Sequence, residues 1–383
     1  MHTSFNAKRV LSLFCAIALL LSSVILPNVV SLKAEGNLDV WDGTSNSTLA
    51  GAGEEDSPYI ISTPEQLCYV VFEAENTSGK YYKLANDIYL NDVANASWQT
   101  NSPNKWESKT NADNNTGFQG NFDGAGHIVY GLYTDNSSNI WSKGGLFPYI
   151  APNGSVTIKN VGIKDANINS SWSAGALIGQ LTGGDASYTV TVSNCFADES
   201  VTLAGAFYTG FIALIDSSCA LDINNCYSRV IFSETAYPNN DNKGAFVGGF
   251  GGSAVRTVSN CYVVLRNADY EHGFNALPTS GSFTCSEVHA ANDASNSLTQ
   301  RNGIAGFGGG HWPTDFKGAS TLSGIFDFTN TWVAGATNDD YISLKVFEKT
   351  EEEIKIWDGT SDSNLTGEGT EANPFVISTP EQL

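Results

Sequence analysis

Positive charge is scarce in this chain. Its 383 residues include 19 Lys and Arg against 40 Asp and Glu, which gives a formal net charge of −21 at pH 7. Such a surplus of acid repels phosphate backbones and anionic headgroups. Nucleic acid and anionic lipid are therefore excluded as the main partners.

Recognisable catalytic motifs are also missing. The five histidines form no His-Glu-x-x-His zinc site, and there is no Gly-x-Ser-x-Gly elbow or phosphate-binding Gly-Lys-Thr loop. Asp123 and His127 could form an acid–base pair, but the glycines around them favour turn-forming roles. Residues 308–312 (Gly-Gly-Gly-His-Trp) are predicted to form a loop. We therefore expect no catalytic, cofactor-binding or metal-binding residue.

Long hydrophobic runs are absent beyond the N-terminus. Two basic residues precede an apolar run over residues 10–26, as in a secretory signal peptide. We assign residues 1–34 to a signal peptide cleaved after Ser31 or Ala34, and expect a secreted, cell-surface protein with no membrane span after cleavage. The run is slightly long for a signal, so an uncleaved anchor is the alternative.

Cysteines at metal-binding spacing are absent as well. None of the cysteines that follow the signal segment forms a Cys-x-x-Cys motif: Cys68, Cys195, Cys219, Cys226, Cys261 and Cys285. Three of them recur about every thirty residues, which favours small buried hydrophobes in a stack. In an oxidising compartment some could pair, and Cys219 and Cys226 are the nearest in sequence, but the count assigns no bond.

A short pattern recurs between residues 144 and 263. A Gly-led apolar segment precedes a strand-like stretch in which an aliphatic residue stands two places before an asparagine. The segments are 144–147, 175–179, 205–208 and 244–248, and the asparagines are Asn160, Asn194, Asn225 and Asn260. The asparagines are 34, 31 and 35 residues apart, and the stretches are rich in β-branched and aromatic residues. This repeat indicates a β-solenoid.

The predicted fold is all-β, a right-handed parallel β-helix beginning with a strand at residues 81–90. Coils of such a fold stack at ~4.8 Å, so that equivalent residues lie one above another. Asparagine tolerates a left-handed backbone and can hydrogen-bond to the amide above it. We therefore expect the four asparagines in one column on an inner edge.

A short helix is predicted before the first coil. Thr63 suits the N-cap, Pro64 the first helical position and Gln66 the return bond of a capping box. Apolar residues at helical spacing follow: Leu67, Val70, Val71 and Ala74. Because an open solenoid end exposes strand edges and core, we expect this helix to act as a cap.

The segments around the repeats are less regular. Residues 91–116 are predicted to form an exposed loop, in which Trp98 and Trp106 are the candidate ligand contacts because exposed aromatic rings stack on sugars. The alternative is that both fold back over the first coil. Residues 264–310 lose the rhythm, and the aromatic residues between 326 and 344 are expected to close the far end.

A longer repeat sets the predicted domain boundaries. Residues 41–67 return as residues 357–383, a shift of 316. We therefore predict a β-helix module over 37–348, a charged linker over 349–355 and the start of a second module over 356–383. These 28 C-terminal residues end before a second helix can form. Proteolysis should remove them without lowering the melting temperature, and a large drop would contradict this interpretation.

Several motifs resemble a known group of bacterial proteins. Residues 118–132 (Phe-Gln-Gly-Asn-Phe-Asp-Gly-Ala-Gly-His-Ile-Val-Tyr-Gly-Leu), the Gly-apolar-apolar-Gly segments and the Asn-Cys-Tyr-Ser at 225–228 are similar to GLUG-motif surface proteins, including IgA-protease-like stalk modules. The resemblance covers roughly residues 40–348. It departs from the pattern over 264–310 and in the Gly205 segment, which lacks its closing glycine until Gly210. It implies a secreted or wall-attached repeat protein with adhesive roles and no catalytic residues.

These observations predict an adhesive or binding scaffold, or a stalk, whose partner is a glycan or a host surface protein. The alternative is a carbohydrate-active β-helix enzyme, a polysaccharide lyase or glycoside hydrolase, which needs carboxylates on neighbouring coils. The acidic residues fall at different positions relative to the nearest asparagine, namely Asp165 at +5, Asp198 at +4, Asp216 at −9 and Asp222 at −3. We therefore expect them to form no such ladder.

Overall fold

The computed structural model describes residues 39–100, 103–107, 117–136, 141–233, 244, 246–251, 254–265, 283–292, 305–318, 322 and 324–349. The predicted signal peptide, the start of the second module and all of the linker except Lys349 lie outside these ranges. Within them, no helix is both long and apolar enough to cross a membrane.

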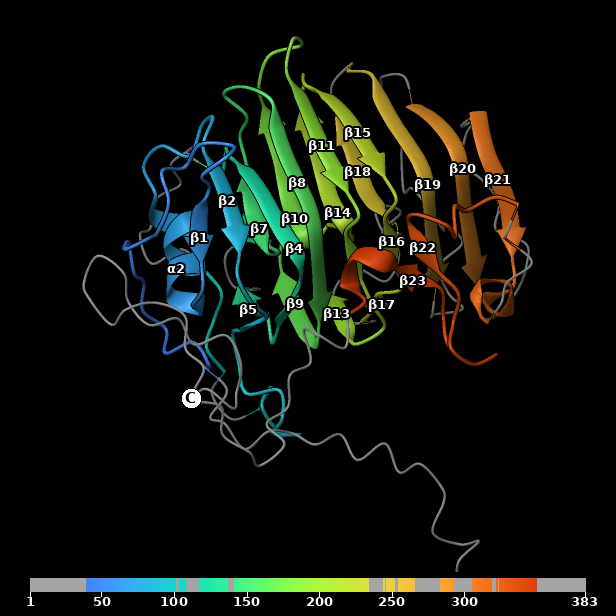
Figure 1. The fold of residues 1–383 in the computed structure, drawn as a ribbon, viewed down its shortest axis with the longest axis horizontal. Coiled ribbons are helices and arrows are strands. Elements are labelled where there is room, and N and C mark those ends of the chain that lie inside the picture. The colour runs from blue at the N-terminus through green and yellow to red at the C-terminus, as the bar shows by residue number, and fades with distance from the viewer. Residues whose placement is uncertain are drawn as a thin grey trace, which may run out of the picture. The chain divides into compact units, whose positions relative to one another are not determined.

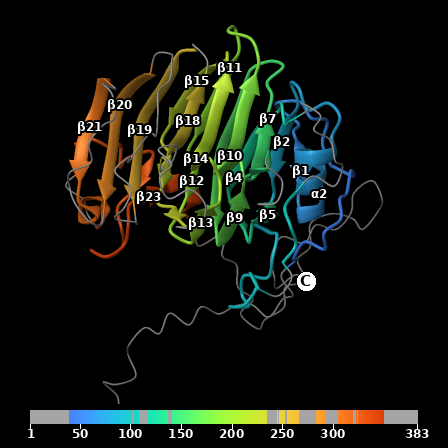
Figure 2. The ribbon, with the colours of Figure 1, turned by 180° about the vertical axis from the view of Figure 1, so that it is seen from behind.

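Three parallel sheets form the faces of the solenoid (Figures 1 and 2). Sheet 1 contains, in spatial order, β1 (Tyr59–Ile61), β2 (Tyr81–Leu84), β4 (Asn121–Tyr130), β8 (Val156–Lys164), β11 (Thr189–Ser193), β15 (Ala220–Asn224), β19 (Arg256–Leu265), β20 (Phe283–Asn292) and β21 (Ala305–His311), with the short β3 (Ile88–Tyr89), β12 (Phe196–Ala197) and β16 (Tyr227–Ser228) beside them. Sheet 2 contains β5 (Tyr133–Asn136), β9 (Ala166–Ser170), β13 (Val201–Ala204) and β17 (Ile231–Phe232). Sheet 3 contains β6 (Lys143–Gly144), β7 (Phe147–Ile150), β10 (Ser173–Gly183), β14 (Tyr208–Ser217) and β18 (Val247–Gly251).

Each complete coil visits the three sheets in turn. The chain passes from β8 through β9 and β10 to β11, and β11 pairs in parallel with β8. The predicted parallel β-helix is thereby confirmed. Its interior is a continuous apolar core that includes Ile158, Val192, Ile223 and Val258 at equivalent positions of sheet 1.

The solenoid extends beyond the predicted coils at both ends. It begins one strand early, because β1 pairs with β2, and it continues past residue 265 through β20 and β21. The strand β21 includes most of the glycine-rich run at 308–312, so the predicted loop there is wrong. The prediction failed because glycines give no alternating hydrophobic pattern in the sequence, although their backbone can still pair with β20.

The predicted asparagine column is present. Asn160, Asn194, Asn225 and Asn260 follow residues that are in register and share left-handed φ angles between 51° and 56°. Asn194 Nδ2 donates to Asn160 Oδ1 at 3.0 Å. We predicted these side chains on an inner edge, but all four are half-buried. Each asparagine lies at a corner of its coil, which leaves the side-chain amide at the edge of the coil. Glu287 continues the column with a φ of 51°, so β20 keeps the corner although the asparagine is lost.

Buried free cysteines follow three of these asparagines. The Cys195 N–H contacts Cys226 Sγ at 3.4 Å, and the Cys226 N–H contacts Cys261 Sγ at 3.3 Å. Burial raises the pKa of the Cys195 and Cys226 thiols well above its ordinary value. These contacts support the interpretation as a stack of small hydrophobes. Cys219 is also free, so it is not joined to Cys226.

The predicted capping helix is confirmed. The helix α2 (Pro64–Cys68) continues as a π-helical turn, η1 (Tyr69–Glu73), at the β1 end of the solenoid (Figure 1). Thr63 Oγ1 accepts the Gln66 N–H at 3.3 Å, while Gln66 Oε1 accepts the Thr63 N–H at 3.2 Å. Leu67, Val70 and Val71 are buried in the core, whereas Ala74 is half-buried at the end of the turn.

A segment after β21 runs back over the outer face of sheet 1. We call residues 312–318, 322 and 324–349 the strap; it carries η2 (Pro313–Phe316), β22 (Trp332–Val333), β23 (Ser343–Leu344) and η3 (Lys345–Phe347), the last elements of the coloured chain in Figure 1. Phe316 stacks on Tyr262 of β19, whereas the later Phe347 contacts Phe196 of β12 and Lys349 reaches Asp87 beside β3. The strap therefore runs opposite to the order of the coils.

The strap covers an aromatic column. Phe196, Tyr227 and Tyr262 stack on successive coils, with centroids 4.8 and 5.0 Å apart and rings within 12° of parallel. Arg229 donates to the Tyr262 hydroxyl at 2.6 Å, and that hydroxyl donates to the Ile342 carbonyl of the strap at 2.7 Å. This column lies outside the coils and needs apolar cover.

The predicted aromatic cluster between residues 326 and 344 therefore forms, but its predicted place at the far end is wrong. Phe326 and Trp332 lie against Tyr262, on the side of the solenoid.

Candidate functional site

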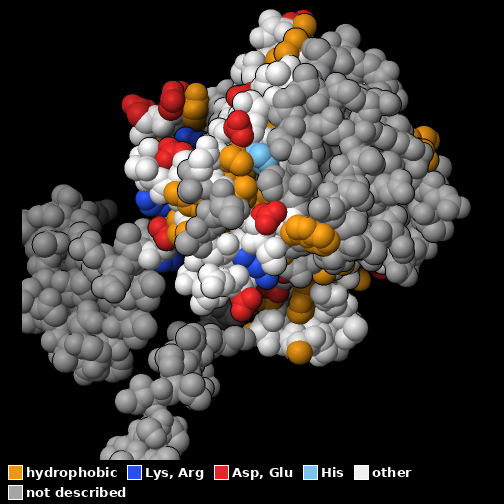
Figure 3. Space-filling view, turned by 90° about the vertical axis from the view of Figure 1, so that its right-hand side faces the viewer, with side chains coloured by type: hydrophobic (Ala, Val, Ile, Leu, Met, Phe, Trp, Pro, Cys, Tyr) orange, Lys and Arg blue, Asp and Glu red, His pale blue; other side chains and the backbone are white. Residues whose placement is uncertain are grey.

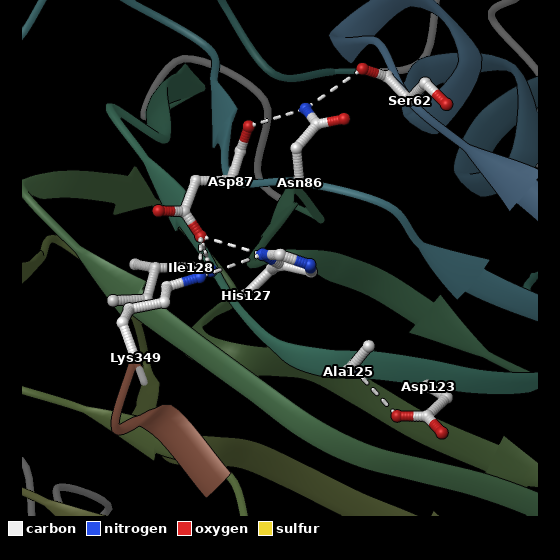
Figure 4. Close-up of polar contacts among 8 residues, drawn as sticks. All are labelled: Ser62, Asn86, Asp87, Asp123, Ala125, His127, Ile128 and Lys349. Carbon is white, nitrogen blue, oxygen red and sulfur yellow. Dashed lines mark hydrogen bonds and ion pairs between the residues drawn. The ribbon is translucent and has the colours of Figure 1, made fainter. Parts of the chain in front are cut away.

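Asp123 and His127 do not form an acid–base pair. Asp123 Oδ1 accepts the Ala125 N–H at 2.8 Å and the Asn160 amide at 2.9 Å, which closes a turn with Ala125 at a φ of 53°. Figure 4 shows the Asp123 side chain directed toward Ala125 and away from His127. The predicted turn-forming role of Asp123 is confirmed, whereas that of His127 is wrong, because His127 lies within β4 and pairs with Val161 of β8.

His127 pairs instead with Asp87, in the turn between β2 and β3. Their Nδ1 and Oδ1 atoms are 3.2 Å apart, and Asp87 Oδ1 also accepts the Ile128 N–H at 3.0 Å (Figure 4). Lys349 Nζ lies 3.3 Å from His127 Nδ1 and 3.7 Å from Asp87 Oδ1. Burial acts to raise the pKa of Asp87, but the hydrogen bonds from His127 and Ile128 and the charge of Lys349 outweigh it, so that the pKa is lowered.

This cluster can anchor the end of the strap. A carboxylate–histidine pair can also serve as a general base. Here, however, the histidine nitrogen that faces the carboxylate also faces an ammonium group, and within the described residues the side-chain partners of His127 are Asp87 and Lys349. The sequence did not single out Asp87 or Lys349, because they lie 40 and 222 residues from His127.

Acid is expected to loosen the strap at this anchor. Because the folded pKa of Asp87 is depressed, its contribution is present above the unfolded value of 3.8 and is lost as the pH falls through the lower folded value. The side chain is 25% exposed, so we expect a change of less than about 1 kcal/mol. Hydrogen exchange of residues 341–349 at neutral and acid pH measures it, with Asp87→Asn as the pH-insensitive control. Equal protection in the wild type at both pH values would contradict the assignment.

Asp165 and Asp198 lie closer together than their sequence positions indicated. Burial and the charge of Asp198 both raise the pKa of Asp165. Asp198 is buried, pairs with Lys164 at 3.3 Å and accepts the Ser200 N–H at 3.0 Å. Ala197 pairs with Ile163, so Asp198 lies level with Lys164 and one position before Asp165 on the neighbouring coil. Counting from the asparagines looked for equal positions and missed this diagonal approach.

Trp98 and Trp106 are buried, with exposed fractions of 8% and 1%. Trp106 Nε1 donates to the Leu146 carbonyl at 3.1 Å, and its ring packs on Trp41 and Phe72, with centroids 5.3 and 4.9 Å away. They fold back over the coils, which was the alternative interpretation. Neither offers a ring face to a ligand, so their candidacy as ligand contacts is wrong: each ring is used to cover the core.

Exposed aromatic rings gather instead at the corner between sheets 2 and 3. Trp141, Trp172 and Phe207 come from three successive coils, just before β6, β10 and β14. Trp141 lies 4.7 Å from Trp172, and Trp172 stacks on Phe207 at 5.6 Å and within 8° of parallel. Trp141 is 58% exposed and the other two are half-buried. We call these three residues the aromatic corner.

A signal for the aromatic corner was present in the sequence. Trp172 and Phe207 stand three positions before Gly175 and Gly210, which pair with each other, whereas Trp141 lies one position earlier in its coil, because Gly144 pairs with Ala174. The register shows that Gly210, and not Gly205, matches Gly175, so the third Gly-led segment is displaced from its predicted place. With Gly205 as the reference, Phe207 fell after the glycine and the repeat of the rings was hidden.

Elsewhere, the described surface carries smaller apolar features. On the face drawn in Figure 3, the described hydrophobic side chains form small patches separated by charged and other polar groups. One exposed tryptophan outside the aromatic corner is Trp312, with 46% of its surface exposed. Among the described residues, no group of three or more His, Cys, Asp or Glu side chains could hold a metal ion.

Comparison with known proteins yields one distant likeness in fold. No family model matches the chain, and no curated protein does. A crystal structure of a "putative immunoglobulin A1 protease from Bacteroides ovatus" matches with a TM-score of 0.44 and 14% identity, covering 78% of this chain and 95% of that chain. A likeness at this level concerns the fold alone.

Proposed function

We propose that this chain is a non-catalytic module, secreted and attached to a cell surface, that acts as an adhesive scaffold or stalk. The observation that carries the proposal is the strap. β-Helix enzymes work on an exposed strand face, whereas here the strap covers one end of the outer face of sheet 1, over Phe196, Tyr227 and Tyr262. The polar groups near its end, Asp87 and His127, hold it there.

The sequence motifs support the same proposal. The resemblance to GLUG-motif surface proteins favours attachment to a bacterial surface, and the N-terminal apolar run favours secretion. The partner we propose is a glycan or a host surface protein rather than a nucleic acid, because the net charge is −21.

A polysaccharide-cleaving enzyme is the second candidate. It is favoured by Asp165, since a carboxyl with a raised pKa beside a second carboxylate is what a general acid requires. Against it, Asp198 is buried and engaged by Lys164 and Ser200.

An activity screen decides between the two candidates. The purified chain is incubated with a panel of neutral and uronic-acid polysaccharides, and reducing ends and unsaturated products are measured. We expect no release above that of a heat-denatured control. Release that disappears in Asp165→Asn but persists in Asp222→Asn would establish the enzyme instead.

A further inference from the structure

We propose that the aromatic corner is a binding site for a neutral glycan chain lying across successive coils. This inference deepens the proposed function and rests on it, since it supplies the ligand class and the place of binding. Trp141, at 58% exposure, offers the most accessible ring of the three.

The geometry of the rings suits an extended sugar chain. The rings belong to consecutive coils, so they form a row along the solenoid axis with centroids 4.7 and 5.6 Å apart. A pyranose unit has a similar length, so neighbouring sugar units would meet neighbouring coils. Trp172 and Phe207 stack on each other within 8° of parallel, whereas Trp141 is inclined at 60° to Trp172, so Trp141 is the ring that presents a face to the apolar C–H face of a sugar unit.

A polar row lies directly beside the aromatic row. The strand β9 leads into Trp172, and its half-buried side chains Asn167 and Asn169 alternate with buried ones. Asn169 Nδ2 donates to Asp135 Oδ1 of β5 at 3.5 Å, and Asn167 Nδ2 donates to Gln99 Oε1 at 3.0 Å. Side-chain amides donate to and accept from sugar hydroxyls, and carboxylates accept from them, so this row offers the polar partners that a sugar needs.

Charge selects a neutral glycan. The chain carries −21 overall, so a uronic-acid or sulfated polymer would be repelled at long range. At the corner itself, the hydroxyls of the buried Ser142 and of Ser171 lie 3.2 Å apart, and one cation, Lys143, donates to the Trp141 carbonyl at 3.4 Å. A row of rings bordered by the half-buried amides of Asn167 and Asn169 suits a sugar, which has both apolar faces and polar edges, better than it suits the apolar centre of a protein interface.

Binding of defined oligosaccharides tests the site. The intact chain is titrated with hexamers of β-1,4-linked glucose, mannose, xylose and N-acetylglucosamine, and with heparin and oligogalacturonate as anionic probes. We expect at least one neutral hexamer to bind, with an affinity that does not change with salt. Trp141→Ala should weaken that binding at least about tenfold, as expected for the most exposed aromatic contact of the site. Trp312→Ala removes an exposed tryptophan elsewhere and should leave it unchanged.

Melting temperatures separate binding from folding. Because Trp141 is mostly exposed, its alanine variant should melt with the wild type, which makes it the deciding variant. Failure of every neutral hexamer to bind, salt-sensitive binding of the anionic probes alone, or wild-type affinity in Trp141→Ala would overturn the site. Cleavage of a hexamer that binds through Trp141 would leave the site standing and refute the non-catalytic function.

Discussion

Gly175→Ala is expected to be among the most destabilising substitutions in this chain. A Cβ at this position would lie 1.9 Å from the Ile178 carbonyl oxygen and 2.5 Å from its carbon. These are backbone atoms, held by a register shift in β10 and by pairing with β14, so they cannot rotate away. We expect a loss of about 3 kcal/mol or more in the free energy of unfolding.

Chemical denaturation measures this loss, and Gly324→Ala is its matched control. A Cβ on Gly324 would meet no heavy atom within 4 Å, so its cost should stay within about 0.5 kcal/mol. Similar values for the two variants would show that β10 relaxes and that the close approach is not a constraint. The same crowding recurs at Gly179 and Gly248, where an added Cβ would lie 2.6 and 2.5 Å from carbonyl oxygens of the preceding coil. Glycine recurs at these positions because the backbone of a neighbouring coil lies too close for a side chain.

Trp332→Ala should release the strap from the solenoid. Trp332 is 1% exposed, and its ring lies 5.6 Å from Tyr262, 6.2 Å from Tyr227 and 4.8 Å from Phe326. Truncating a buried tryptophan costs about 3–5 kcal/mol. The described residues of the strap contribute no strand to the three sheets of the solenoid, so the loss should fall first on residues 324–349. Hydrogen exchange should rise there and change little in β10.

Trp332→Phe provides the control for this variant. The buried Nε1 of Trp332 has no hydrogen-bond partner, so replacing the indole by a phenyl ring sacrifices volume and no polar contact. We expect a loss of about 1–2 kcal/mol and a protected strap. Equal losses in the phenylalanine and alanine variants would mean that the ring's packing does not hold the strap. Unfolding of β10 together with the strap in Trp332→Ala would mean that the two form one cooperative unit.

The sequence was most informative where equivalent positions of successive coils share the same residue and the same backbone conformation. Asn160, Asn194 and their successors occupy the same left-handed corner, so four copies of the signal predicted one column. The capping box at Thr63 was equally readable, because its partners lie within three residues.

Contacts between distant segments could not be predicted in this way. The strap returns across several coils, and Lys349 meets a histidine 222 residues earlier. Asp165 and Asp198 stand at adjacent rather than equal positions of neighbouring coils, so a search for equal positions hid the approach of the two carboxyl groups. The burial of Trp106 likewise depends on Leu146, 40 residues away, to which its indole N–H donates.

The return path of the strap also determines how the module bears tension. Where the described chain enters, Val40 pairs with Tyr89 and the Trp41 N–H donates to the Tyr89 carbonyl at 2.9 Å. Where it leaves, Lys349 contacts Asp87, two residues before Tyr89. A force applied between these two points would act on the contacts around β3 and at the end of the strap. The stacked coils lie outside the path between the two points and would carry little of that force. Under such a pull, we expect the strap to peel from its Lys349 end while the coils beyond β4 stay folded.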